Sequence, residues 1–97
     1  MTEINWTPQA VEDYNDIIEL LLNDSYFYAE NFHDMIQSAL EKLKKFNYLG
    51  RIIPEIGNSR IREVILGKYR LMYFIKSDYI IELIAIVHGS RDIRFSL

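Results

Sequence analysis

The hydrophobic pattern of the chain changes once, near Phe46, and this change limits the folds that the chain can adopt. Before Phe46 apolar residues recur at helical spacing, whereas after it they gather in short runs of Ile, Val, Tyr and Phe, which are typical of strands. The chain has 97 residues, about the size of one domain. We therefore expect residues 1–97 to form a single α+β domain.

Two amphipathic helices joined by a short link are expected in the first half. Thr7 is a favourable N-cap and Pro8 a favourable first helical residue, so a helix is expected from there to about Asn23. Asp24 and Ser25 can turn the chain and cap a second helix. The apolar faces comprise Ala10, Tyr14, Ile17, Ile18 and Leu21, then Phe32, Ile36, Ala39, Leu40 and Leu43. Two such helices form a helical hairpin.

Three strands joined by tight turns are expected in the second half, after a loop that contains glycine and proline. The short links at Gly67-Lys68 and Ser77-Asp78 suit β-hairpins. A further strand is expected near the N-terminus. The expected strands are Glu3–Trp6, Arg60–Leu66, Tyr69–Lys76 and Tyr79–His88. The predicted order β-α-α-β-β-β packs the helical hairpin on one face of a mainly antiparallel sheet.

Arg70 lies in the middle of a predicted strand, although arginine is almost never fully buried without a partner. Side-chain alternation places it with Met72 and Phe74 on the sheet face away from the helices. The same open face is expected to carry Glu82, Ile84, Ile86 and His88, with Ile81, Leu83, Ala85 and Val87 facing the helices. An ion pair with Glu55 or Glu82 and a functional role are both open for Arg70. The apolar members of this face predict a binding surface.

Composition narrows the chemistry and the location. The chain has no cysteine, two histidines without metal-ligand spacing, and no phosphate-binding glycine loop, so we expect neither a metal nor another cofactor. Absence of cysteine suits a reducing cytosol. The N-terminus has no basic region followed by an apolar run, and no apolar stretch is long enough to span a bilayer. We expect a cytoplasmic protein without a membrane partner.

Charge is distributed unevenly along the chain. Residues 1–44 include nine acidic and two basic residues, whereas residues 45–97 include five acidic and nine basic residues. The formal net charge is −3. A partner rich in phosphate or carboxylate is therefore expected to meet the second half of the chain.

Two sets of residues are candidates for a functional site. If Glu55, Arg70 and His88 converge, they could cleave RNA, with the glutamate as base on the ribose 2′-hydroxyl, the arginine on the phosphorane and the histidine as acid. A structural role for His88 is the alternative. The candidate binding residues are Arg51, Arg62, Arg70, Met72, Phe74 and Arg91. For Arg62 we favour a cross-strand salt bridge with Glu63.

Five short motifs occur in series. They are WTPQAVEDYNDI (Trp6–Ile17), GRIIPE (Gly50–Glu55), IRE (Ile61–Glu63), GKYRLMY (Gly67–Tyr73) and VHGSRD (Val87–Asp92). In order and spacing they resemble the RelE/ParE superfamily of toxins from type II toxin–antitoxin, or plasmid stabilisation, modules. The resemblance covers essentially the whole chain.

The resemblance implies a RelE/ParE-like fold and a toxin neutralised by a cognate antitoxin. The antitoxin wraps the toxin with its C-terminal segment and binds operator DNA with its N-terminal part, so DNA is expected to be contacted only through the antitoxin. ParE-like members inhibit DNA gyrase, whereas RelE-like members cleave messenger RNA on the ribosome. In one nuclease branch a glutamate, an arginine and a histidine act, and Glu55, Arg70 and His88 match these positions.

The resemblance lies nearer the ParE branch. Gly89 stands where the nucleases have an aromatic residue, and the catalytic lysine cluster and C-terminal tyrosine of the RelE type are missing. A ribosome-targeted nuclease is normally strongly basic, whereas this chain is acidic. Three hypotheses follow: a ParE-like gyrase inhibitor, a ribosome-dependent endoribonuclease, and an inert module that binds its antitoxin in transcriptional autoregulation.

Overall fold

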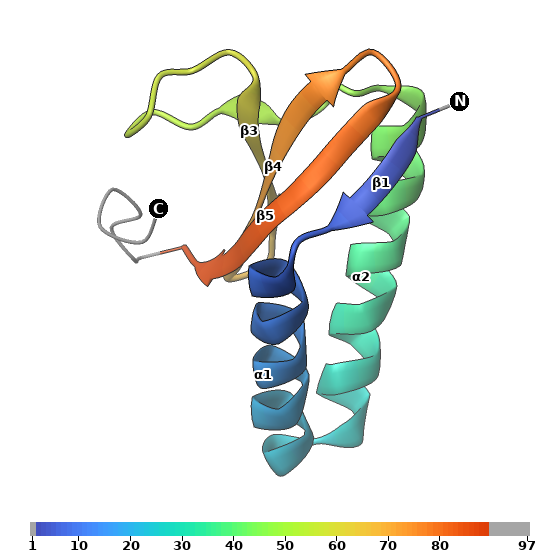
Figure 1. Ribbon diagram of the computed structural model, residues 1–97. Helices are drawn as coiled ribbons and strands as arrows, with labels where there is room; N and C mark the ends of the chain where they lie inside the picture. The colour runs from blue at the N-terminus through green and yellow to red at the C-terminus, as the bar shows by residue number, and fades with distance from the viewer. Residues whose placement is uncertain (1, 90–97) are drawn as a thin grey trace.

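A computed structural model describes residues 2–89 as a five-stranded sheet with two helices on one of its faces (Figure 1). The elements are β1 (Glu3–Trp6), α1 (Pro8–Asp24), α2 (Tyr26–Lys45), β2 (Arg51–Ile52), β3 (Ile61–Leu66), β4 (Tyr69–Ser77) and β5 (Ile80–His88). The strand order is β1-β5-β4-β3-β2, and every neighbouring pair is antiparallel except β1 and β5. The α+β fold predicted from the sequence is confirmed. The two-residue strand β2 was not predicted, because its segment was expected to be a loop.

The helical hairpin depends on caps that the sequence predicts. The hydroxyl of Thr7 accepts a hydrogen bond from the Ala10 N–H, and Pro8 occupies the first turn of α1. Ser25 serves both helices, because its N–H donates to the Leu21 carbonyl while its hydroxyl accepts from the Phe27 N–H. A single residue therefore links α1 to α2.

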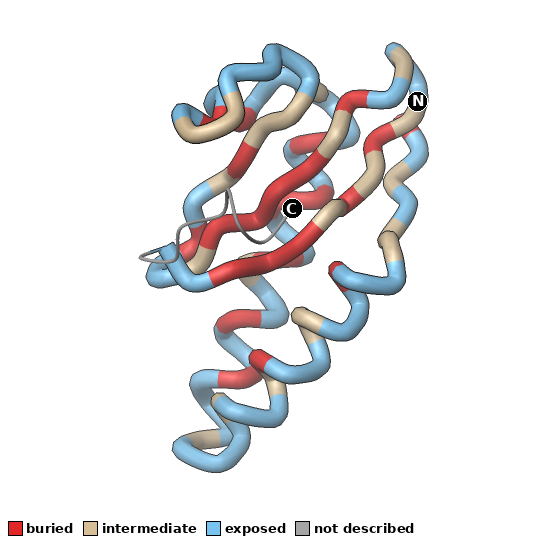
Figure 2. Tube along the Cα trace, turned by 60° about the vertical axis from the view of Figure 1, so that its left-hand side comes forward, coloured by how far each residue is buried: buried red, intermediate tan, exposed pale blue. Residues whose placement is uncertain are grey.

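The main core lies between the helices and the sheet. On β4, Leu71, Tyr73 and Ile75 face the helices and are almost wholly buried, as alternation predicts. They meet α2 at a face that includes Phe32 and Ile36. Figure 2 shows buried residues concentrated along the central strands and on the inner sides of the helices. Each such side chain contributes about 1.5–3 kcal/mol when it leaves water.

A β-bulge in β5 changes which side chains face the helices. Met72 pairs with Ala85, but the next residue, Tyr73, pairs with Leu83, so Ile84 is an extra residue without a partner on β4. An inserted residue reverses the side-chain alternation beyond it. Leu83 and Ile86 therefore both face the helices.

The bulge contradicts part of the expected pattern of β5. Ala85 and Val87 were expected to face the helices, but they pack on the opposite face in a second cluster with Ile53 and Met72. His88 lies on the helix side, because it pairs with Tyr69 and its ring makes an edge-to-face contact with the Tyr69 ring. The sequence-based prediction was wrong for these residues, and likewise for Ile86, because it carried one uninterrupted alternation through a strand that contains a bulge.

The face opposite the helices is not a bare apolar surface. Ile53 lies in the loop after β2 and, like Met72, has no solvent exposure. Phe74 is half-buried. The apolar binding surface expected on this face is therefore absent at Met72, where the cluster with Ile53 forms a small second core.

Helix α1 and its N-cap Thr7 supply hydrogen-bond partners to β5 where β1 ends. The Thr7 hydroxyl donates to the carbonyl of Leu83 at 2.7 Å, next to the bulge. The Asp13 carboxylate accepts from the Ile86 N–H at 2.9 Å. Since β1 pairs with β5 only as far as Leu83, this N–H belongs to an uncovered strand edge and needs a partner. No helix within residues 2–89 is both long and apolar enough to span a membrane.

Replacing Asp13 tests this connection between α1 and β5. Asp13→Ala leaves the Ile86 N–H without its acceptor, and we expect a loss of about 2 kcal/mol in the free energy of unfolding. Asp16→Ala is the matched control. Asp16 is exposed on the same helix, and its replacement removes the same charge. Urea unfolding of both variants measures the difference. Equal losses would show that the carboxylate acts through helix charge alone.

Candidate functional site

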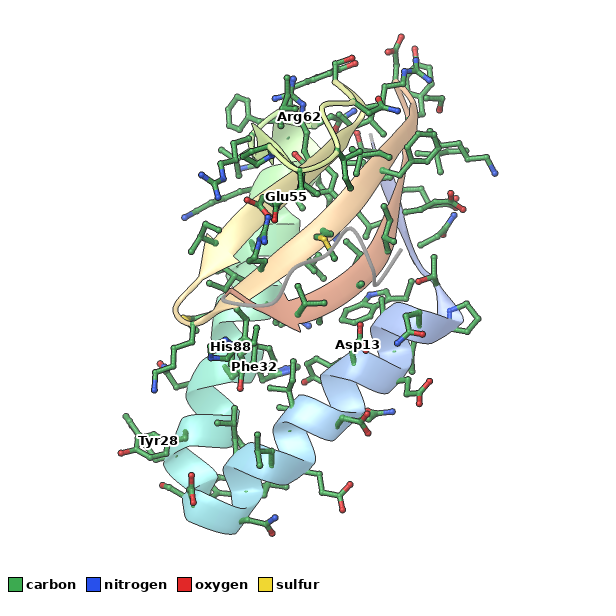
Figure 3. The ribbon with its side chains drawn as sticks, turned by 90° about the vertical axis from the view of Figure 1, so that its left-hand side faces the viewer. Asp13, Tyr28, Phe32, Glu55, Arg62 and His88 are labelled. Carbon is green, nitrogen blue, oxygen red and sulfur yellow. The ribbon has the colours of Figure 1, made fainter. Side chains whose placement is uncertain are left out.

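Four charged side chains form one connected network on the sheet face opposite the helices. Glu63 on β3 accepts from Arg70 Nε at 2.5 Å with one carboxylate oxygen and from Arg51 Nε at 2.6 Å with the other. The two terminal nitrogens of Arg70 donate to the two oxygens of Glu55, at 2.9 and 3.1 Å. Figure 3 shows Glu55 over the sheet on this face. Arginine and glutamate thus alternate from Arg51 on β2 to Glu63 on β3, Arg70 on β4 and Glu55 in the loop after β2.

Burial makes this network a structural requirement. The side chain of Glu63 has no solvent exposure and that of Arg70 is 6% exposed, whereas Glu55 and Arg51 are 27% and 60% exposed. Hydrogen bonds to the Glu55 and Glu63 carboxylates raise the pKa of Arg70 above its ordinary value, against the lowering effect of burial. An unpaired buried charge costs several kcal/mol. Arg70 therefore lies in mid-strand as the counter-ion of Glu63.

The structure brings together two of the three predicted catalytic residues. Glu55 and Arg70 meet in the network, whereas His88 lies on the other side of the sheet, where its ring is 5.9 Å from that of Tyr69. In Figure 3 His88 lies beside Phe32 of α2 and away from Glu55. The expected convergence of the three residues is therefore not found, because the bulge in β5 moves His88 to the helix side.

Arg62 does not form the expected salt bridge with Glu63. Adjacent strand residues point to opposite faces, and Arg62 lies on the helix side of β3. Its guanidinium donates to the carbonyls of Ser59 and Gly50, both at 2.9 Å, and lies 4.9 Å from the centre of the Tyr48 ring. Arg62 thus fixes two loops rather than pairing with a carboxylate.

The remaining predicted binding residues have different surroundings. Arg51 is largely exposed while paired with Glu63. Met72 is fully buried, and Phe74 is half-buried. Arg91 lies outside the described residues.

Glu63 belongs to this site, but the sequence analysis did not predict it as the partner of Arg70. The signal was present in the β3–β4 hairpin, where Leu66 pairs with Tyr69 and Glu63 with Met72. This register places Glu63 diagonally across from Arg70 on the same face, within reach of a long side chain.

A hydrogen-bonded tyrosine orders the loop before β2, which delivers Arg51 to Glu63. The Tyr73 hydroxyl accepts from the Gly50 N–H at 2.9 Å and donates to the Asn47 carbonyl at 2.8 Å, and burial raises the pKa of Tyr73. A Cβ at Gly50 would lie 2.5 Å from the Glu63 carbonyl oxygen. This close approach requires glycine at position 50.

The helix side of the molecule carries an apolar groove instead of a charged network. It has a volume of about 580 Å³ and lies between the helical hairpin and the β3–β4 turn. Its lining includes Leu20, Tyr28, Phe32, Tyr69 and His88. Leu20 and Tyr28 are more than half exposed. Such a surface is suited to binding a macromolecule. The described residues contain no group of three or more side chains that could hold a metal ion.

Comparisons with known proteins agree with this architecture. The family model described as "ParE toxin of type II toxin-antitoxin system, parDE" matches residues 4–93. Among solved structures, a chain of the chromosomal ParDE TA system from P. aeruginosa is similar with a TM-score of 0.58. The identity is 18%, and the match covers 91% of this chain and 96% of that chain, so it shows a shared fold. A search of the curated proteins finds no match.

The two arginines paired with Glu63 offer a test of the network. We expect Glu63→Gln to lower the free energy of unfolding by about 3 kcal/mol, because it breaks two charge-assisted hydrogen bonds in a buried site. Arg51→Gln is the companion variant, and its loss is expected to be no more than about 1 kcal/mol, since this arginine is largely solvated. Urea unfolding midpoints provide the comparison. A near-neutral Glu63→Gln would contradict a structural role for the network.

Proposed function

The chain belongs to the family of ParE toxins of type II toxin–antitoxin systems, and on that premise we propose that it inhibits DNA gyrase and is neutralised by a cognate antitoxin. The family match over residues 4–93 is the observation that carries the proposal. A toxin with this target acts in the cytoplasm, where gyrase and its DNA are found. No cofactor is required, because inhibition by binding involves no chemical step of the toxin's own.

The geometry supports inhibition by binding more than RNA cleavage. Glu55 and Arg70 occupy each other's hydrogen-bonding atoms, so neither is poised for a ribose hydroxyl or a phosphate in this structure. His88 lies across the sheet from them and cannot share one scissile bond with Arg70. A general acid must reach its leaving group within hydrogen-bonding distance. The ribonuclease hypothesis therefore has less support from these residues than the gyrase hypothesis.

Neutralisation by an antitoxin is supported by the exposed apolar surface of the hairpin. Leu20, Tyr26, Phe27 and Tyr28 are between 56% and 73% exposed, near the link between α1 and α2. Exposed aromatic and aliphatic side chains gathered in this way are typical of a protein–protein interface. The proposed antitoxin covers it and, through its own DNA-binding part, connects the pair to the operator. An inert module that only binds the antitoxin would use the same surface without acting on gyrase.

Replacing His88 separates the gyrase hypothesis from the ribonuclease hypothesis. We expect the purified chain to inhibit supercoiling of relaxed plasmid by purified gyrase. Although His88 lines the groove, it is exposed, and glutamine keeps a polar, hydrogen-bonding side chain there, so we expect His88→Gln to keep this inhibition within about twofold. Arg70→Ala is unsuitable for this purpose, because it removes the counter-ion of buried Glu63 and so disturbs folding. Circular dichroism checks that the histidine variant is folded.

The ribonuclease hypothesis predicts a different result in the same experiment. The ribonuclease hypothesis requires that gyrase keep its full activity in the presence of the chain, while messenger RNA on ribosomes is cut by the wild-type chain and not by His88→Gln. If the chain neither inhibits gyrase nor causes messenger RNA to be cut, the hypothesis of an inert antitoxin-binding module is the one that remains.

A further inference from the structure

The charges of this chain are separated between two ends of the molecule. Residues 8–41, which form the hairpin up to the last turn of α2, include eight acidic residues and no lysine or arginine. Residues 42–62 include six basic residues and one acidic residue, Glu55, whose two oxygens both bind Arg70. In Figure 1 the hairpin link and the end of α2 lie at opposite ends of the molecule. The formal net charge therefore hides a strongly basic end.

Most cations of this basic end are exposed, and two of them are also paired, Lys44 with Glu41 at 3.2 Å and Arg51 with Glu63 at 2.6 Å. The basic end comprises Lys42, Lys44, Lys45, Arg51, Arg60 and Arg62, and all of them except the half-buried Arg62 are exposed. The three lysines lie in the last turn of α2. Arg62 connects the loop after α2 to the loop before β3, because its guanidinium donates to the Gly50 carbonyl in the first loop and to the Ser59 carbonyl in the second. The α2 lysines precede the 46–50 loop and Arg62 contacts it, whereas Arg51 is held by Glu63 on the opposite face of the sheet.

An ordered aromatic ring lies within this basic end. Tyr48 is 52% exposed, and the Arg62 guanidinium lies 4.9 Å from the centre of its ring. The guanidinium is fixed by two carbonyl hydrogen bonds at 2.9 Å, so it holds the ring in place. Phe46, in the same loop, is 64% exposed. Exposed aromatic rings among cations are the combination by which proteins bind single-stranded nucleic acid, with bases stacking on rings and phosphates meeting cations.

We infer that the basic end binds single-stranded nucleic acid, with Tyr48 as the stacking ring and the α2 lysines and Arg60 as phosphate contacts. Of the eight acidic residues of the hairpin, Glu41 lies beside the basic end, where it pairs with Lys44 at 3.2 Å. Those near the hairpin link are screened from the basic end, because the longest dimension of the molecule is 38 Å, several times the Debye length of about 8 Å at physiological ionic strength. An acidic protein segment would also meet the cations, but it would gain nothing from a pre-ordered ring with a guanidinium behind it. The inference goes beyond the proposed function, because here the chain itself contacts nucleic acid without gyrase or antitoxin.

Fluorescence anisotropy of a labelled oligothymidylate of about 20 nucleotides, titrated with the full chain, tests the inference. With about four phosphate contacts, binding should weaken about 50-fold between about 50 and 200 mM salt. Tyr48→Ala should weaken binding about tenfold, and Tyr48→Phe should restore it, since phenylalanine keeps the stacking ring. The double variant Lys42→Gln with Lys45→Gln should weaken binding. It should also lower the slope of log K against log salt by the equivalent of about two phosphate contacts.

Matched controls come from the other end of the molecule. Lys68→Gln removes a cation that lines the groove on the helix side, and Tyr26→Ala removes a ring that is 73% exposed at the hairpin link. Both should leave oligonucleotide binding unchanged. Absence of binding at about 50 mM salt would overturn the inference. Equal competition by polyglutamate, with no effect of Tyr48→Ala, would also overturn it and would assign the basic end to an acidic protein. Because gyrase is absent from this assay, its outcome is independent of the proposed function.

Discussion

A carboxylate without access to water must be paired, and the pairing of Glu63 organises the sheet face opposite the helices. Arg70 reaches it from β4 and Arg51 from β2, so the buried charge connects three neighbouring strands. Arg70 in turn holds Glu55 and with it the loop after β2. Replacing such a network by apolar residues is often neutral or stabilising, so its contribution is better described as specificity of register than as net stability.

The second constraint is the bulge in β5, and its consequence is functional. By inserting Ile84 it turns His88 towards the helices, while Arg70 stays on the other face. Thr7, the N-cap of α1, stabilises this arrangement at the Leu83 carbonyl, and Asp13 of α1 does so by accepting from the Ile86 N–H, which β1 no longer covers. One face of the sheet is thus closed by an ion network and a small apolar cluster. The other offers a groove beside the exposed hairpin, and such a groove is consistent with the proposed inhibition by binding.

Sequence reasoning predicted most of the fold because its signals were local. The caps at Thr7 and Ser25 and the alternation of β4 agree with the structure. The bulge could not be predicted, because Ile80–Val87 is apolar on both faces apart from Glu82, so an inserted residue leaves no break in the pattern. Strand β2 has two residues, too few for any periodicity.

The candidate site was predicted only in part, for reasons of geometry. Arg70 and Glu55 were expected as one possible pair, and they do meet. The predicted salt bridge between Arg62 and Glu63 is not formed, because neighbouring residues of a strand point to opposite faces. Glu63 was available as the partner of Arg70 from the hairpin register, but that register had to be combined with the rule that a buried arginine needs a counter-ion.

The central claim is that this toxin arrests growth through gyrase. The most direct test is to induce the chain in one culture and to follow plasmid supercoiling and protein synthesis together. We expect supercoiling to fall and gyrase–DNA breaks to accumulate while protein synthesis continues at first. Immediate arrest of protein synthesis, with messenger RNA cut on the ribosome and supercoiling unchanged, would contradict it.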